Sequence, residues 1–265
     1  MPSGADSLLL KAAGLRKRYG GVHAVDGFDL ELSAGQIAGL IGPNGAGKTT
    51  VFNIITGLDS PDAGSVHLAG RDITRRPAHR ISRMGIARTF QNIRLLGHMS
   101  VLDNVKIACH RHARYGLATA LLRTPPFRRR ELEIAERALS CLRLFGLEAW
   151  ADEPAAALPY GRQRKLEVAR ALATEAKLLL LDEPAAGLNP QETAELAGLI
   201  RGLRDRFGVT ILLIEHDMRM VMSLCEWVEV LDHGRVIARG TPQEVKSNER
   251  VIEAYLGRPK AKETK

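Results

Sequence analysis

The stretch that most constrains the fold of this chain is GPNGAGKTT, at residues 42–50. An apolar run at residues 36–41 precedes it and is typical of a buried strand, and residues 51–55 after it are typical of a helix. A strand, a glycine-rich turn and a helix in this order form a cradle in which backbone N–H groups and the helix dipole bind phosphate. The spacing of the first glycine to Gly-Lys-Thr matches the P-loop pattern, so we expect a nucleotide site here.

The loop residues have separate expected roles. In the P-loop pattern the lysine, here Lys48, reaches the β- and γ-phosphates, and the hydroxyl of Thr49 holds Mg²⁺. The predicted nucleotide contacts in this loop are Gly42, Pro43, Asn44, Gly45, Ala46, Gly47, Lys48, Thr49 and Thr50.

A second signal lies far along the chain, where four consecutive leucines at residues 178–181 are followed by Asp182 and Glu183. Such an apolar run is typical of a parallel strand covered on both faces. In P-loop enzymes a carboxylate at a strand end holds Mg²⁺ from the side opposite the loop hydroxyl, and Asp182 fits this role. Glu183 is placed to orient or deprotonate an attacking water. A phosphate cradle alone is compatible with a kinase, a GTPase or a motor. The pair Asp182 and Glu183 adds a candidate metal ligand and a candidate base for an attacking water.

Length and composition limit the number of domains and the cellular class of the protein. The 265 residues suit one large domain or one domain with a subdomain, and a hydrophobic content of 45% is enough for a packed core. No run approaches the roughly 18 apolar residues of a membrane-spanning helix, and the N-terminus lacks a signal-peptide pattern. Cys109, Cys141 and Cys225 lie far apart without metal-binding spacing, which is typical of a reduced cytosolic protein.

The net charge of +8 favours polyanionic partners, namely nucleic acid, nucleotides or an anionic membrane face. Part of this charge is clustered, at Arg16-Lys17-Arg18, Arg75-Arg76 and Arg128-Arg129-Arg130. Each cluster taken alone is equally consistent with a solvated surface.

Periodicity predicts an alternation of strands and helices around a largely helical middle, from about residue 77 to 176. Short strands that suggest an antiparallel sheet are expected at residues 8–13, 25–32 and 65–70, and later strands at 210–214, 228–231 and 235–238. Helices are expected at 101–114, 131–145, 161–176, 191–207 and 218–225, with a helical piece at 242–256. The pair Pro125-Pro126 is expected to break any helix before residue 131.

A third signal is the segment LPYGRQ at residues 158–163, followed by RKLEVARAL. This segment resembles the signature motif and following helix of ABC-type ATPases. Tyr19, upstream of the loop, resembles the aromatic residue that stacks on adenine in that family. Gln91 resembles the loop glutamine that touches Mg²⁺ and the attacking water, and His216 resembles the switch histidine on the γ-phosphate. Residues 186–189 resemble the loop that crosses the dimer interface, and the resemblance covers about residues 8–256.

The resemblance implies an α/β fold: a P-loop NTPase core with a mostly parallel sheet, an antiparallel β subdomain and a helical subdomain. A single ABC-type ATPase domain is expected at residues 8–256, followed by a disordered tail at 257–265. Its expected parts are the core and antiparallel sheet, about 8–90 and 177–240, the helical subdomain, about 92–176, and the C-terminal helical piece, 242–256.

The resemblance also implies a mechanism in which two such subunits close head to tail around ATP and Mg²⁺. The implied catalytic residues are Glu183, His216 and Gln91, and the implied metal ligands are Thr49, Gln91 and Asp182. The residues implied to contact the partner's nucleotide are Pro159, Tyr160, Gly161 and Arg162. This motif departs from the usual LSGGQ, because Pro159 offers neither a hydroxyl nor an N–H and Tyr160 replaces a glycine.

The particular variants LPYG, DEPAAGLNP and IEHDM are similar to one of the paired ATPases of branched-chain amino-acid uptake systems. That similarity implies two membrane permease subunits, a second ATP-binding subunit in a homo- or heterodimer, and indirectly a solute-binding protein. It implies a peripheral location on the cytoplasmic face of the inner membrane and no direct contact with nucleic acid. Residues 93–105 either line a groove for a cytoplasmic helix of the permease or belong, for the most part, to the ordinary core of the helical subdomain.

Two alternatives remain at this point. One is an ABC-type ATPase that acts on nucleic acid or the ribosome through the basic surface. The other is a nucleotide-gated clamp without catalysis, against which the intact Glu183 and His216 argue.

Overall fold

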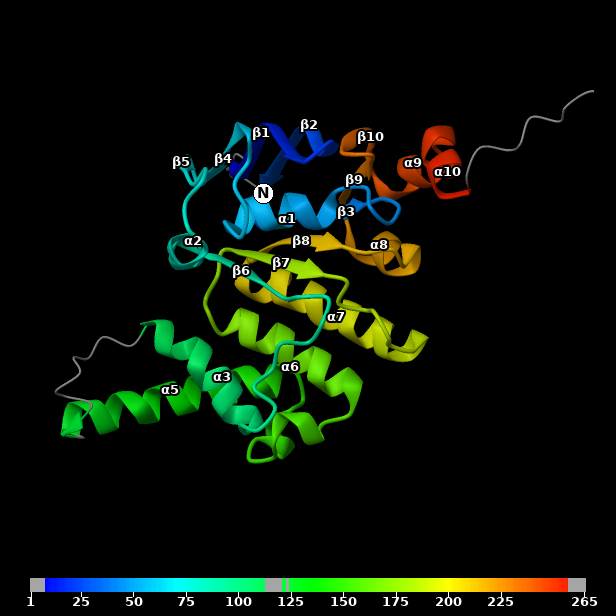
Figure 1. Cartoon of the computed structure of the whole chain (residues 1–265). Coiled ribbons are helices and arrows are strands. Elements are labelled where there is room, and N and C mark those ends of the chain that lie inside the picture. Colours follow the sequence, from blue (N-terminus) through cyan, green and yellow to red (C-terminus); the bar gives the residue numbers. More distant parts are fainter. Residues whose placement is uncertain (1–7, 113–120, 123, 257–265) are drawn as a thin grey trace, which may run out of the picture.

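The computed structural model describes residues 8–112, 121–122 and 124–256. Two sheets and a set of helices form stacked layers (Figure 1). The four-stranded sheet lies on one side of helix α1, Lys48–Thr56, and the six-stranded sheet lies on the other. The predicted α/β class is therefore confirmed.

The central sheet has the strand order β10-β9-β3-β8-β7-β6. All neighbouring strands are parallel except β9 and β10, which are antiparallel. Its strands are β3 Ile37–Ile41, β6 Ile86–Arg88, β7 Leu178–Asp182, β8 Thr210–Ile214, β9 Trp227–Asp232 and β10 Arg235–Gly240. Every residue of β3, β7 and β8 is buried, as expected of parallel strands covered on both faces.

The second sheet is antiparallel, with the order β2-β1-β4-β5. Its strands are β1 Leu8–Tyr19, β2 Val22–Ser33, β4 Ala63–Leu68 and β5 Arg71–Asp72. Alternate residues of β2, among them Phe28, Leu30 and Leu32, are buried against the layer below. The first two strands run further than the expected 8–13 and 25–32, so that β1 carries Tyr19 at its end.

The remaining helices are α2 Ala78–Met84, α3 Val101–Cys109, α5 Pro125–Leu144, α6 Tyr160–Leu172, α7 Pro190–Phe207, α8 Met218–Leu224, α9 Pro242–Lys246 and α10 Glu249–Leu256. Short 3-10 turns occur at His110–His112, Glu148–Trp150 and Ala155–Ala157. Helices α7 and α6 cover the face of the central sheet opposite α1, with α3 and α5 beyond them (Figure 1). Across the described residues, each helix is too short or too polar to span a bilayer.

The central sheet divides the interior into two apolar cores. Along β7, Leu178 and Leu180 pack into the core formed with α1 and the antiparallel sheet. Leu179 and Leu181 pack into the core formed with α3, α5, α6 and α7. The alternation follows from the two-residue repeat of a strand and explains why all four residues before Asp182 are apolar.

The structure corrects several expected element bounds. Strand β6 lies inside the stretch expected to be helical and pairs in parallel with β7. The proline pair does not break a helix; it starts one, because α5 has Pro125 and Pro126 in its first turn, where the missing N–H groups cost nothing. The helix expected at 161–176 spans Tyr160–Leu172. The expected tail, 257–265, and the end of the helix expected at 101–114 lie outside the described residues.

Candidate nucleotide-binding and catalytic site

The glycine-rich loop encloses the lysine that opens α1. The Nζ atom of Lys48 donates to the carbonyl oxygens of Gly42 at 2.7 Å and Pro43 at 2.9 Å. The residue is only 8% exposed. Burial lowers the pKa of its ammonium, and the charges of Glu183 and Asp182 oppose that shift. The lysine is therefore held inside the cradle with two of its donors paired.

Two glycines give the loop its shape. A Cβ at Gly42, with φ at 150°, would lie 2.0 Å from the carbonyl oxygen of Leu231. A Cβ at Gly47, with φ at 107°, would lie 2.2 Å from the carbonyl oxygen of Ala24. Gly47 also caps α1 without any side chain, so the N–H groups of the first turn have no side-chain acceptor. The loop therefore packs directly against the backbone of Leu231 and of Ala24. The N-terminus of α1 is available to bind an anion.

Asp182 ends β7 and pairs with Arg88 at the end of β6. The distance from Arg88 Nη2 to Asp182 Oδ2 is 2.7 Å, and both side chains are buried. Arg88 Nη1 also donates to Asn53 Oδ1 at 2.7 Å, and Cζ of the guanidinium lies 5.4 Å from the centroid of the Phe52 ring and 5.0 Å from that of the Phe90 ring. Arg88 was not predicted as a site residue, because β6 itself was not predicted.

Three residues predicted from distant segments meet next to the loop. Gln91 Nε2 donates to Glu183 Oε2 at 2.8 Å, and His216 Nδ1 lies 3.7 Å from Glu183 Oε1. The N–H of Glu183 donates to the carbonyl oxygen of Ile214 at 2.9 Å, which ties it to the end of β8. The three side chains are therefore placed to act on the same small region.

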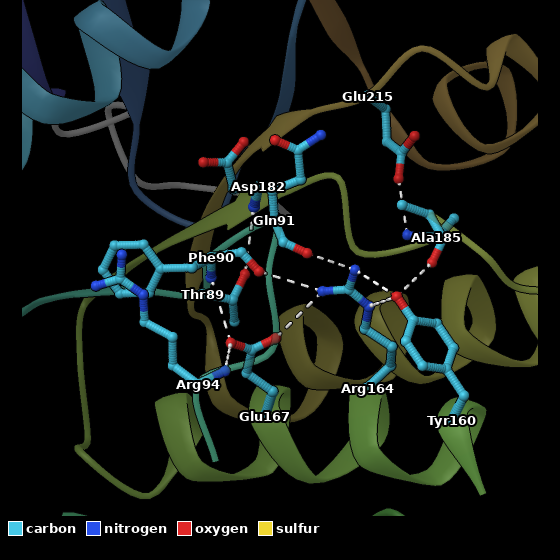
Figure 2. Close-up of polar contacts among 11 residues, drawn as sticks. Thr89, Phe90, Gln91, Arg94, Tyr160, Arg164, Glu167, Asp182, Ala185 and Glu215 are labelled. Atoms are coloured by element: carbon cyan, nitrogen blue, oxygen red, sulfur yellow. Dashed lines mark hydrogen bonds and ion pairs between the residues drawn. The ribbon is translucent and has the colours of Figure 1, made fainter.

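Glu215, next to His216, was also not predicted. Its buried carboxylate accepts from the N–H of Ala185 at 2.9 Å and from the N–H of His216 at 3.1 Å. Burial raises the pKa of this carboxyl, and the backbone donors oppose the shift. The carboxylate fixes the loop after Glu183 to the segment that carries the histidine (Figure 2). The sequence signal was an acidic residue directly after the apolar strand β8.

Tyr19 stands at the end of β1 with 47% of its surface exposed. Its hydroxyl donates to Asp59, whose other carboxylate oxygen lies 2.8 Å from Lys17 Nζ. The hydrogen bond to Asp59 raises the pKa of the phenol, and one with Thr50 lowers it. The hydroxyl of Tyr19 therefore lies near the last residue of the loop, and Lys17 Nζ lies 5.2 Å from the centroid of the half-exposed ring.

The signature residues lie apart from the loop of their own chain. Pro159 precedes α6 and offers no side-chain cap, and Tyr160 and Gly161 form the first turn. The guanidinium of Arg162 lies 3.7 Å from the centroid of the Trp150 ring. Helices α6 and α1 cover opposite faces of the central sheet (Figure 1), so the structure does not bring residues 159–162 to the cradle of the same chain.

Comparison with known proteins agrees with this arrangement. The family model described as ABC transporter matches residues 25–186, and the one described as branched-chain amino acid ATP-binding cassette transporter matches residues 235–261. Among solved structures, an ATP-binding cassette of an ABC transporter in its ADP conformation has a TM-score of 0.83 and 31% identity, and the match covers 94% of this chain and 99% of that one.

Two named relatives match almost from end to end. The high-affinity branched-chain amino acid transport ATP-binding protein BraF of Pseudomonas aeruginosa is 47% identical, over 94% of this chain and 98% of that protein. The corresponding protein LivG of Escherichia coli is also 47% identical, with the same coverage. These relatives do not favour an ATPase that acts on nucleic acid or the ribosome. With a family model matched over residues 25–186 and relatives 47% identical over 94% of its length, this chain belongs to the ABC transporter family, as an ATP-hydrolysing subunit of the branched-chain amino acid group.

Proposed function

We propose that this chain is one of two ATP-hydrolysing subunits that energise the import of branched-chain amino acids, and that it binds two permease chains at the cytoplasmic face of the membrane. The names of the relatives and the match at residues 235–261 support the substrate class. The observation that carries the catalytic part is the meeting of Gln91, Glu183 and His216 beside the glycine-rich loop.

In this proposal ATP lies along the loop at residues 42–50, with adenine on the exposed ring of Tyr19. Lys48 exchanges its two carbonyl partners for β- and γ-phosphate oxygens. The first turn of α1 adds N–H donors and the positive end of the helix dipole.

The donor set suits Mg²⁺, which is usually bound through one or two carboxylates together with substrate phosphates and water. Thr49 offers a hydroxyl at an exposed position, and Asp182 offers the carboxylate oxygen that Arg88 does not hold. The amide oxygen of Gln91 would be a third protein ligand. Within the described residues no cluster of three or more His, Cys, Asp or Glu side chains is arranged for a metal, which agrees with a site completed by the nucleotide. When bound, Mg²⁺ would neutralise charge on the transferring phosphate.

Glu183 then orients and deprotonates the attacking water. Its two carboxylate oxygens are held by Gln91 and His216. His216 donates to the γ-phosphate once it turns away from Glu183. Residues 159–162 and 186–189 act in trans on the nucleotide of the second ATP-binding subunit. Because Pro159 has no N–H and the Tyr160 hydroxyl is engaged within its own chain, the trans contact falls to backbone N–H groups at the start of α6.

A groove of about 330 Å³ between the α1–α2 region and α3–α6 is the proposed dock for a permease helix. It differs from the expected one, because residues 93–105 do not line it and Val101 and Val105 are fully buried in the core. Its apolar walls come from Leu58, Ile81, Ile86, Phe90 and Ile107. We assign residues 92–176 to a helical subdomain. Its role is to transmit changes at the nucleotide to the permease helix bound in this groove.

The decisive test is Glu183→Gln, which keeps the size of the side chain and removes its basicity. We expect phosphate release to fall by about 100-fold or more, the range for loss of a general base, while ATP affinity stays near that of the unaltered chain. Phosphate release and equilibrium binding of ATP would be measured on the same preparation. Turnover close to that of the unaltered chain would refute the assignment of Glu183.

Lys48→Ala is the matched comparison, since it removes the phosphate contact and leaves Glu183 in place. Here both ATP binding and phosphate release are expected to be lost. If this variant bound ATP normally, residues 42–50 would not be the cradle.

A further inference from the structure

Arg164, in the second turn of α6, is a buried guanidinium whose partners lie on another segment. Its Nη2 donates to the carbonyl oxygen of Gln91 at 2.6 Å, and its Nη1 donates to that of Phe90 at 3.2 Å. The exposed fraction of Arg164 is 3%, and Glu167 is its ion-pair partner at 3.4 Å. A buried guanidinium is tolerated only when its donors are satisfied. Helix α6 therefore holds the backbone of the Gln91 segment directly (Figure 2).

Glu167 binds the same segment through its backbone N–H groups. Its Oε1 accepts from the N–H groups of Phe90 and Arg94, each at 3.4 Å, while Oε2 contacts Arg164. Carbonyls and N–H groups of residues 90–94 are thus bound by side chains one turn apart on α6. The segment that carries Gln91 is attached to α6 as a unit, and the Gln91 amide donates to Glu183.

Tyr160 extends the same network to a third segment. Its hydroxyl accepts from Arg164 Nη2 at 2.8 Å and Nε at 3.1 Å, and it donates to the carbonyl oxygen of Ala186 at 3.1 Å. The ring lies against Gly187, where a Cβ would come within 2.9 Å of Tyr160 Cε1. A glycine at position 160, as in the usual signature motif, would provide neither contact.

We propose that Tyr160 and Arg164 are positioning residues that join the Gln91 segment to the loop at residues 186–188 and to the first turn of α6. The Gln91 segment serves the nucleotide of this chain. The loop and the first turn of α6 serve the nucleotide of the partner. The inference rests on the proposed function, since that function gives the two ends of the network their separate nucleotides. When Gln91 leaves Glu183, the Phe90–Gln91 backbone shifts, and Arg164 carries this shift to Tyr160 and Ala186. One site thereby changes the surface offered to the other.

The test is hydrogen–deuterium exchange on the full-length chain, with and without Mg²⁺ and a non-hydrolysable ATP analogue. Peptides that cover residues 42–50, 90–94 and 185–188 are followed. In the unaltered chain all three are expected to gain protection. In Tyr160→Phe, which keeps the ring and removes only the hydroxyl, the first two are expected to respond as before. The gain at 185–188 is expected to fall on the order of tenfold, as for loss of a hydrogen bond to a charged donor.

Lys165→Gln is the matched control on the same helix, because Lys165 Nζ pairs with Glu195 at 2.9 Å, outside this network. It is expected to behave like the unaltered chain. Tyr160 is 44% exposed, so Tyr160→Phe is expected to fold, and its thermal midpoint would verify this. The variants Tyr160→Phe and Arg164→Lys are expected to be non-additive in the exchange at 185–188, since they interrupt one path.

Two results would overturn the proposal. One is an equal gain in protection at 185–188 in Tyr160→Phe and the unaltered chain. The other is the absence of any gain there in the unaltered chain while residues 42–50 respond. A lack of response at 42–50 itself would count against nucleotide binding, and so against the proposed function from which this inference starts.

Discussion

Glu183 has a strained backbone at the point where the proposed chemistry takes place. Its φ of 48° lies in the left-handed region, which costs a residue with a Cβ on the order of 1 kcal/mol or more. The hydrogen bond from its N–H to Ile214, together with the contacts of its side chain to Gln91 and His216, holds this conformation. The carboxylate is thus aimed by its surroundings rather than by the preference of its own backbone.

Arg88 gives a prediction at the same scale. In Arg88→Met the buried carboxylate of Asp182 loses its cationic partner, and we expect the free energy of unfolding to fall by about 3 kcal/mol, as when a buried pair loses one member. Urea unfolding of the full chain measures this change. Arg88→Lys keeps the charge but cannot bridge Asn53 and Asp182 together, so we expect an intermediate loss.

The double variant Arg88→Met with Asp182→Asn separates this cause from lost packing. Removing the charge of Asp182 is expected to recover part of the stability lost in Arg88→Met. If the two losses simply added, the pair would not be the origin of the effect.

Among the elements, those with a clear apolar or periodic pattern were predicted closely, whereas the three-residue strand β6 was not. The bounds of β8 were predicted to the residue, and those of α7 to within one. Strand β6 has only three residues and no periodicity to detect, so its pairing with β7 could not be predicted. The sequence indicated Asp182 but not its partner Arg88 for this reason.

The candidate site shows the same division. The loop and the carboxylate pair were found because their chemistry is local in the sequence, and Gln91 and His216 because the family order indicated them. The contact between Tyr160 and Ala186 joins residues 26 positions apart through one hydroxyl, and no sequence pattern reports such a contact. The roles assigned to all of these residues remain predictions.

Helix α7 begins with a reciprocal cap, and this gives a prediction for the element. Asn189 accepts from the N–H of Glu192 at 2.9 Å, and Glu192 accepts from the N–H of Asn189 at 3.0 Å. Asn189→Ala removes the side-chain acceptor, so we expect a loss of about 1 kcal/mol in the free energy of unfolding. Asn189→Ser keeps an acceptor and is expected to lose much less. Equal losses in a denaturant titration would mean that the cap is not what stabilises the helix start.

For the whole molecule, the arrangement of layers leaves the proposed permease groove between the α1–α2 region and α3–α6. Leu58 follows α1 and Ile107 lies on α3, and both are among the exposed large apolar side chains. The groove therefore lies between the part of the chain that follows the glycine-rich loop and the part that contains α3 and α6. A permease helix bound in this groove would contact both parts, so a change in their relative position would move it.

Ile107→Glu tests this surface. A charge in the apolar wall is expected to reduce the recovery of permease chains from detergent-solubilised membranes by about tenfold, the effect of losing a central anchor. ATP binding is expected to stay unchanged. Leu132→Glu is the control, since Leu132 is 67% exposed on α5 and does not line the groove. Equal recovery with both variants would place the dock elsewhere.

The leucines of β7 leave its pairing register poorly specified by hydrophobicity alone. A slip by one residue would send each leucine to the other core, where it would again find apolar neighbours. Polar contacts at the strand end remove this ambiguity: Asp182 finds Arg88 only in one register, and its N–H then meets the hydroxyl of Thr89 at 3.2 Å. The carboxylate proposed for the metal ion also determines how the sheet assembles, so a change at Asp182 would affect folding fidelity as well as chemistry.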